Sequence, residues 1–238
     1  MTSSYLPALP HSAISEPFKD IFFVTGTRKW HFMDLDWQFS RNMTVVREGD
    51  ELTIFNSVRL TDAGLIELEA FGKITNLVQV GGLHGVDDAF YRDTFGVTYW
   101  AQPGAGQPGV PVARELIEGG ELPVSGADLY TFKHSKVPET VFRLNRDGGI
   151  LITCDAFQNY VASDEFFSEE STKVMTDMGF FTPTNVGPVW MQAAEPGPED
   201  FATLAQWSYE HVFCGHGVPV IGGASAAYSE TFKRLFDI

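Results

Sequence analysis

Basic residues are scarce in this sequence: 16 lysines and arginines stand against 31 aspartates and glutamates, which gives a formal net charge of −15 at pH 7. A chain this acidic is repelled by phosphate backbones and by anionic lipid headgroups. No cluster of lysines and arginines offsets the balance. We therefore expect no nucleic-acid partner and no membrane partner, and the composition is compatible with a small-molecule substrate.

Cysteines and long apolar runs are also few. The two cysteines, Cys154 and Cys214, cannot form a disulfide framework, and both follow apolar residues, so we expect buried free thiols. No apolar run approaches the roughly 18 residues of a membrane span. The N-terminus lacks the basic region and apolar segment of a signal peptide. These absences predict a cytoplasmic protein.

The sequence also lacks the motifs that assign a chemistry directly. It has no nucleophile elbow, no phosphate-binding glycine loop and no dinucleotide fingerprint. It does have 44% hydrophobic and 13% aromatic residues, which suffice for a large buried core.

Apolar runs and turn residues predict an order of strands and helices. A meander of strands comes first and strands then alternate with helices, which implies two sheets with helices outside. The fold class is therefore α/β, a four-layer αββα sandwich of two mixed sheets over residues 21–238, after an N-terminal arm at residues 1–20. The predicted strands are 21–24, 42–46, 52–55 continuing through 57–60, 74–80, 97–100, 129–132, 140–144, 150–152 and 212–214; the predicted helices are 61–71, 88–95, 169–178, 198–211 and one starting near 223.

Two polar residues stand where predicted strands give way to loops, a place where rigid scaffolds present functional groups. Asp155 follows an uncharged apolar run, so its carboxylate must be paired, hydrogen-bonded or metal-bound. The alternative is an aspartate that caps the next turn. His216 stands between Gly215 and Gly217, whose small size leaves room for a ligand.

A third segment carries His84 and Asp88, four residues apart after another apolar strand. They could converge on one ion, although Asp88 could instead cap a helix. His134 is a further candidate, but Lys133 and Lys136 suggest an exposed strand edge. Histidine nitrogens and carboxylate oxygens together suit zinc, iron or manganese, and the cysteines lie in surroundings too apolar for primary ligands.

These segments resemble the metallo-β-lactamase superfamily from about residue 20 to the C-terminus. The run Leu151–Ala156 resembles the family's bridging-aspartate motif, and residues 215–217 resemble its final Gly-His-Gly motif. Residues 82–89 resemble the first metal motif, with His84 and Asp88 at its first histidine and its aspartate. Val86 and Ala89 replace the other two histidines.

The resemblance implies a metal-dependent hydrolase, with ligands drawn from His84, Asp88, His134, Asp155 and His216. Because two histidines are replaced, it implies one divalent ion at most, zinc, iron or manganese, and Asp88, Asp155 and His216 are the preferred set. Asp88 would be catalytic, because the family's aspartate orients the attacking water or accepts its proton. Esters, lactones, thioesters and phosphodiesters are all permitted as substrates.

Two other hypotheses remain open at this point. The chain could be a non-catalytic binding or interaction domain that kept the fold and lost the metal, or it could carry redox chemistry on iron.

The pocket walls that we expect at the strand ends are aromatic: Phe90, Phe157, Tyr160 and Trp190.

Overall fold

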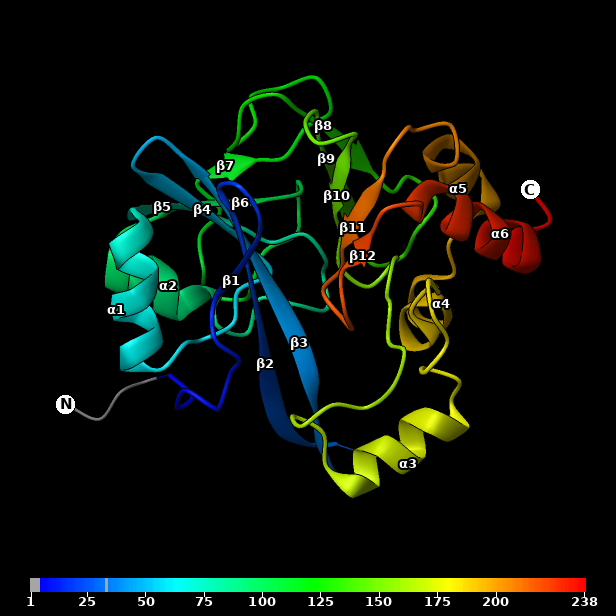
Figure 1. Ribbon diagram of the computed structural model, residues 1–238, viewed down its shortest axis with the longest axis horizontal. Helices are drawn as coiled ribbons and strands as arrows, with labels where there is room; N and C mark the ends of the chain where they lie inside the picture. The colour runs from blue at the N-terminus through cyan, green and yellow to red at the C-terminus, as the bar shows by residue number, and fades with distance from the viewer. Residues whose placement is uncertain (1–4, 33) are drawn as a thin grey trace.

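Two β-sheets lie face to face in the computed structural model, which describes residues 5–32 and 34–238 (Figure 1). Within these residues the first sheet follows the order of the chain: β1 (Ser15–Phe18), β2 (Ile21–Phe32), β3 (Leu35–Glu48), β4 (Glu51–Phe55), β5 (Lys73–Val78), β6 (Thr98–Ala101) and β7 (Arg114–Glu115). Strands β1 to β4 pair antiparallel and β4 to β7 pair parallel. The sheet is therefore mixed, as predicted.

The second sheet, again within the described residues, has the order β12-β11-β10-β9-β8. Its strands are β8 (Ala127–Thr131), β9 (Thr140–Leu144), β10 (Ile150–Ile152), β11 (His211–Phe213) and β12 (Val220–Ile221). Strands β10 and β11 run parallel, while the other neighbours are antiparallel. The chain segments that follow β10 and β11 thus leave the sheet at the same edge.

Helices cover the outer face of each sheet (Figure 1). The helices are α1 (Asp62–Phe71), α2 (Asp88–Phe95), α3 (Glu169–Asp177), α4 (Pro188–Ala194), α5 (Pro198–Leu204) and α6 (Ala224–Phe236). Side chains of α1 and α2 pack on the first sheet, and those of α4, α5 and α6 pack on the second. The predicted αββα sandwich is confirmed. Helix α3 lies against β3 near the tip of the long β2–β3 hairpin.

The two sheets meet through a third apolar layer between them. Phe55 of β4 and Phe142 of β9 face each other there, with ring centroids 5.0 Å apart and planes at 74°. Neither ring is exposed to solvent. Burial of a side chain of this size stabilises the fold by about 1.5–3 kcal/mol, and the edge-to-face pairing adds to that. This layer fixes the separation of the strand ends that carry the candidate site.

The β2–β3 hairpin is much longer than the sequence predicts. The predicted strands at 21–24 and 42–46 are only its inner ends, and the backbone pairing continues without a break from Ile21↔Val46 to Phe32↔Leu35. Residues 25–41 mix charged and aromatic side chains, so they show no apolar run. Backbone hydrogen bonds extend both strands where the composition gives no signal of burial.

Two predicted elements differ from the structure. Residues 57–60 do not continue β4, because Asn56 adopts a left-handed conformation (φ 55°) and turns the chain out of the sheet. The helix predicted over 198–211 ends at Leu204, where Ala205 caps it and a turn leads into β11. Helix α1 begins as predicted, with the Thr61 side chain accepting a hydrogen bond from the Gly64 N–H.

The predicted N-terminal arm is partly ordered against the first sheet. Residues 15–18 form β1 on the edge of β2, and His11 forms a bridge with Gly26; residues 1–4 lie outside the described residues. Cys154 and Cys214 are buried free thiols, as predicted. No helix in residues 5–32 and 34–238 is long and apolar enough to cross a membrane.

Candidate metal centre and cavity

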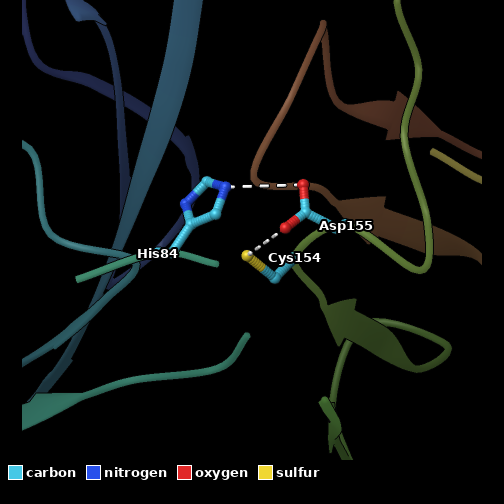
Figure 2. A group of neighbouring side chains, drawn as sticks. All are labelled: His84, Cys154 and Asp155. Carbon is cyan, nitrogen blue, oxygen red and sulfur yellow. Dashed lines mark hydrogen bonds and ion pairs between the residues drawn. The ribbon is translucent and has the colours of Figure 1, made fainter. Parts of the chain in front are cut away.

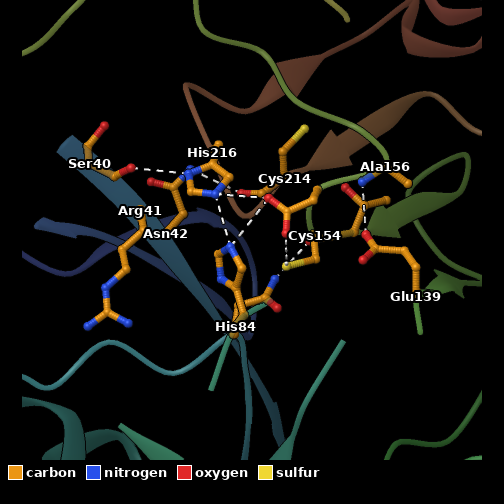
Figure 3. A network of polar contacts seen from close by, with 12 residues as sticks. Ser40, Arg41, Asn42, His84, Glu139, Cys154, Ala156, Cys214 and His216 are labelled. Atoms are coloured by element: carbon orange, nitrogen blue, oxygen red, sulfur yellow. Dashed lines mark hydrogen bonds and ion pairs between the residues drawn. The ribbon is translucent and has the colours of Figure 1, made fainter. Parts of the chain in front are cut away.

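Three loops bring His84, Asp155 and His216 together at one end of the sandwich. His84 lies between β5 and α2, Asp155 follows β10, and His216 follows β11. The Nε2 atoms of the two histidines are 2.9 Å apart. Oδ1 of Asp155 lies 3.1 Å from Nε2 of His216 and 3.5 Å from Nε2 of His84 (Figures 2 and 3). Two imidazole nitrogens and one carboxylate oxygen thus converge from separate parts of the chain.

The spacing of these three atoms fits one small divalent cation. Donor atoms on a tetrahedral zinc, with bonds of about 2.0–2.1 Å, lie roughly 3.3 Å from one another. The three observed separations fall around that value. Two histidine nitrogens and one carboxylate are also a donor set found in catalytic zinc sites. The residues present therefore fit the metal that such a site would take.

Electrostatics also favours the protonation states that bind a metal. Burial lowers the pKa of His84, although the neighbouring Asp155 opposes the shift, so its imidazole is neutral near pH 7. Burial by itself raises the pKa of Asp155, but His84 and His216 outweigh it and hold the pKa below the ordinary value. A neutral imidazole and an ionised carboxylate are the forms that coordinate metal ions.

Tyr160 and the backbone of Ser40 orient the ring of His216. The Tyr160 hydroxyl donates to the Ser40 carbonyl, and Nδ1 of His216 lies 3.1 Å from both the hydroxyl oxygen and that carbonyl oxygen. Because the hydroxyl proton is used, Nδ1 of His216 is the donor to these oxygens. Nε2 of His216 is left facing His84 (Figure 3) and Oδ1 of Asp155.

The loop that carries His216 is held to the first sheet by Asn42 of β3. Its side-chain amide donates to the carbonyls of Cys214, at 3.0 Å, and Gly217, at 2.6 Å. Gly217 has φ 81°, and a Cβ there would lie 2.1 Å from the carbonyl oxygen of Asn159. Only glycine satisfies both conditions. The glycine after His216 therefore fixes where the imidazole lies.

The loop of His84 is fixed through its backbone. The His84 carbonyl accepts a hydrogen bond from Nε2 of Gln79 at 2.9 Å and another from the Gln107 side chain. At Gly81, a Cβ would come within 2.5 Å of Oε2 of Glu139 and 2.8 Å of Sγ of Cys154. The chain can pass this close to the site only because residue 81 has no side chain.

A cavity of about 390 Å³ opens beside the three donor atoms. All three residues line it, together with one face of the β2–β3 hairpin and parts of α3 and α4. Its other lining residues are Arg28, Trp30, Phe32, Trp37, Phe39, Arg41, Leu83, Gly85, Val86, Gln158, Met175, Met178, Phe180, Gly187, Val189, Trp190 and Gln192. A mostly apolar cavity with a few convergent polar groups is typical of a small-molecule site.

Comparison with known proteins gives a result at the level of structure only. No family model and no curated protein matches this sequence. Solved structures match along nearly the whole chain: the FIM-1 metallo-β-lactamase from Pseudomonas aeruginosa in its mono-zinc form has a TM-score of 0.62 at 13% identity, over 95% of this chain and 96% of that one. The DIM-1 metallo-β-lactamase has a TM-score of 0.61 at 11% identity, over 97% and 99%.

A metallo-β-lactamase from Hirschia baltica aligns over 95% of this chain and 98% of its own, with a TM-score of 0.58 at 15% identity. The chain has the metallo-β-lactamase fold. The resemblance inferred from the sequence is thus confirmed for the fold. At these identities the likeness does not extend to the activity or substrates of those enzymes.

The sequence predicts Asp88 as the catalytic residue. In the structure its carboxylate packs against Gly85, next to His84, and does not line the cavity. Its Oδ1 accepts a hydrogen bond from Ser57 at 2.6 Å and its Oδ2 one from Tyr99 at 2.7 Å. Burial raises the pKa of Asp88 to about 7, although the two hydroxyls counteract part of the shift. Both oxygens are therefore engaged by the protein.

His134 lies in the loop between β8 and β9, with its side chain 54% exposed. Its Nδ1 is 3.5 Å from Oδ1 of Asp200, and its backbone N–H also donates to that carboxylate. It does not line the cavity. Of the five predicted ligands, the structure brings together His84, Asp155 and His216, and it gives Asp88 and His134 other partners.

Cys154 and Glu139 are two further buried residues next to the site. The donor atoms of His84, Cys154 and Asp155 lie within 4.8 Å of one another (Figure 2), with Sγ 3.9 Å from Oδ2 of Asp155. Burial raises the pKa of the Cys154 thiol well above its ordinary value, which favours the protonated sulfur as long as no metal ion is bound. The expectation that the cysteines are not primary ligands stays a prediction.

Sequence reasoning missed Glu139, which is fully buried. Its Oε1 accepts a hydrogen bond from the Ala156 N–H at 2.9 Å (Figure 3), while Oε2 has no hydrogen-bond partner among the described residues. Burial and the nearby Asp155 raise the pKa of Glu139 well above its ordinary value. The sequence feature that could have identified Glu139 is its position as a carboxylate directly before the predicted strand at 140–144.

Of the four aromatic residues expected as pocket walls, only Trp190 lines the cavity. Phe90 and Phe157 pack inside the apolar layers, and Tyr160 lies beneath His216. The walls come instead from the hairpin, which the sequence pattern did not identify as two long strands.

Proposed function

We propose that the protein is a metal-dependent hydrolase that holds a single divalent ion between His84, Asp155 and His216. The observation that carries the proposal is the convergence of their three donor atoms, with separations of 2.9, 3.1 and 3.5 Å. Zinc, iron and manganese all accept this donor set. The metallo-β-lactamase fold, found in solved structures that include a mono-zinc form, supports it further.

The residues around the site argue against a second ion. Val86 and Ala89 offer no donor atoms where the family motif has histidines. Asp88, the remaining member of that half-site, gives both oxygens to Ser57 and Tyr99. Any ion bound there would have to displace two hydrogen bonds from a buried carboxylate.

A divalent ion at this site would act as a Lewis acid and lower the pKa of a water molecule. The chain supplies the remaining functions. Tyr160 holds the His216 ring with Nε2 facing the cavity, and Asp155 keeps its negative charge between the two histidines. The mostly apolar cavity walls would orient the apolar part of a substrate and exclude bulk water from the reacting bond.

Metal content tests the proposal directly. Protein purified without chelators should carry close to one equivalent of zinc, iron or manganese by elemental analysis, and added metal should raise its melting temperature. Asp155→Ala and His216→Ala should lose the metal and keep the fold. His134→Ala is the matched control, because it removes a histidine whose ring is exposed and engaged elsewhere.

The second candidate is a non-catalytic binding domain, which Val86 favours because it places an apolar side chain in the cavity wall where the family motif has a ligand. Metal content close to zero, with no stabilisation by added zinc, iron or manganese, would support this candidate and overturn the first. Equal metal loss in His134→Ala and His216→Ala would also contradict the assignment of the site.

A further inference from the structure

One face of the β2–β3 hairpin forms a continuous wall of the cavity. Side chains alternate between the two faces of a strand, and the register pairs Trp30 with Trp37 and Arg28 with Phe39. The residues on this face are Arg28, Trp30, Phe32, Trp37, Phe39 and Arg41, and all six line the cavity. We call them the hairpin wall. It presents two guanidinium groups beside a band of aromatic rings.

The two arginines of the hairpin wall have different partners. Arg41 forms a buried ion pair with Asp87 and donates to the Ser57 carbonyl at 3.2 Å. Arg28 has no carboxylate partner among the residues that the structure describes, and its contact is the ring of Trp30, 4.8 Å from its guanidinium carbon. Its Nε is buried without a hydrogen-bond partner. Arg28 is therefore the lining cation without an ion pair among the described residues, although the charge of Asp87, which is paired with Arg41, also acts on it.

The charge of the cavity contrasts with that of the protein. Its lining has two guanidinium groups and a single carboxylate, Asp155, in a chain of net charge −15. Burial and the nearby charge of Arg41 lower the pKa of Arg28, while the charge of Asp87 counteracts part of the shift, so the two cations are close enough to repel each other. An anion between them would relieve that repulsion. The cavity is thus suited to a negatively charged group.

The remaining lining is apolar and reaches the surface. Phe32 is 56% exposed, Leu83 44% and Val189 41%, and all three line the cavity. Exposed apolar side chains gathered at the mouth of a cavity mark a site for an apolar ligand. The lining therefore fits a molecule with a hydrophobic body and one charged end.

We propose that the hairpin wall binds an amphipathic organic monoanion, with its carboxylate on Arg28 and its apolar body against Trp30, Trp37 and Phe39. One guanidinium without an ion pair matches one negative charge and can bind a carboxylate through two parallel hydrogen bonds. If the bound monoanion is the substrate, the proposal rests on the proposed function, since the group to be hydrolysed would then lie beside His84 and His216. The binding of the monoanion to the hairpin wall does not depend on a metal.

The test measures binding in the absence of metal and of catalysis. The full chain is treated with chelator, which prevents a carboxylate from binding to metal, and titrated by calorimetry at about pH 8, where histidines carry little charge. The probes are 4-phenylbutanoate, the neutral 4-phenylbutan-1-ol and 4-phenylbutyl phosphate. The variants are Arg28→Gln and, as a control, Arg114→Gln, an arginine that is 60% exposed on β7 and outside the cavity.

We expect 4-phenylbutanoate to bind most tightly, and Arg28→Gln to weaken it by about tenfold or more while leaving the alcohol unchanged. Arg114→Gln should bind all three probes as the parent does. Trp37→Ala should weaken the acid and the alcohol by the same factor, because it removes apolar contact only.

Equal affinity for acid and alcohol, or equal loss of both in Arg28→Gln, would overturn the carboxylate assignment. Tighter binding of the phosphate would overturn the assignment to a monoanion. These results are independent of metal content, so the proposed hydrolase can fail while the binding proposal holds, and the reverse is equally possible.

Discussion

Asp88→Asn tests how the buried carboxylate of Asp88 is held. Asp88 is 1% exposed, and its two oxygens accept hydrogen bonds from Ser57 and Tyr99. Asparagine has the same shape. Its oxygen can accept from Tyr99, and its amide can donate to the Ser57 oxygen, so the substitution removes the ionisation and keeps the packing.

The magnitude follows from the pKa of about 7, raised by burial from an ordinary value of 3.8. Between these two values the folded protein holds a proton that the unfolded chain has released. The stability that Asp88 contributes therefore falls as the pH rises from about 4 to about 7, and is constant above that. Three pKa units correspond to about 4 kcal/mol. Relative to the parent, Asp88→Asn should gain up to that amount of stability across this window.

Urea unfolding followed by tryptophan fluorescence at several pH values between about 4.5 and 7.5 measures this difference. Asp177→Asn, at an exposed position at the end of α3, is the control and should run parallel to the parent. A difference between Asp88→Asn and the parent that does not change with pH would refute the reasoning, since it would mean that Asp88 is ionised in the fold at no cost.

Three further substitutions test the site and its support. Tyr160→Phe should lower metal affinity by about tenfold, because it removes a partner of the His216 ring. Competition with a chromogenic chelator measures this affinity, and an unchanged value would contradict the role of the hydroxyl. Trp190→Ala should cost about 3–5 kcal/mol in urea unfolding, and a cost below about 1 kcal/mol would mean that the core closes over the gap. Gly217→Ala should destabilise the fold far more than Gly109→Ala. Gly109 has a similar positive φ (79° against 81° at Gly217), but a Cβ there would have no atom within 4 Å. Equal losses of stability would rule out the clash at position 217.

The sequence was informative where buried strands end. Asp155 and His216 each follow a short apolar run, and β10 and β11 pair in parallel, so both side chains emerge at the same edge. A charged or ionisable residue directly after a fully apolar strand must find a partner, and each is the partner of the other here. His84 joins them through a glycine-rich turn that a strand-end argument also identifies.

The sequence could not show which candidate carboxylate faces the cavity. Asp88 stands in the expected position of the family motif, but its direction depends on Ser57 and Tyr99, which lie 31 and 11 residues away along the chain. His134 had no nearby signal of its partner either, because Asp200 is 66 residues further on. Contacts between distant polar residues decide such roles, and local patterns do not encode them.

The hairpin wall was readable in principle, because Arg28, Trp30 and Phe32 alternate on one strand and Trp37, Phe39 and Arg41 on the next. The positions between them are polar, some exposed and some buried, so the two strands contain no apolar run. Residues that form a cavity wall alternate along a strand as core residues do, but they include charged side chains that a core strand lacks.

Val86 and the hairpin wall belong to the lining of one cavity. Val86 stands where the family motif has a histidine, and it lines the same cavity as Arg28 and Trp37. This apolar residue adds hydrophobic surface next to His84. Under the proposed function, one ion would be held by His84, Asp155 and His216, and a single ion offers less positive charge to an acidic ligand than two would. Arg28 would then supply the cation that recognises the charged end of the ligand, while the chemistry would take place at the three donor residues.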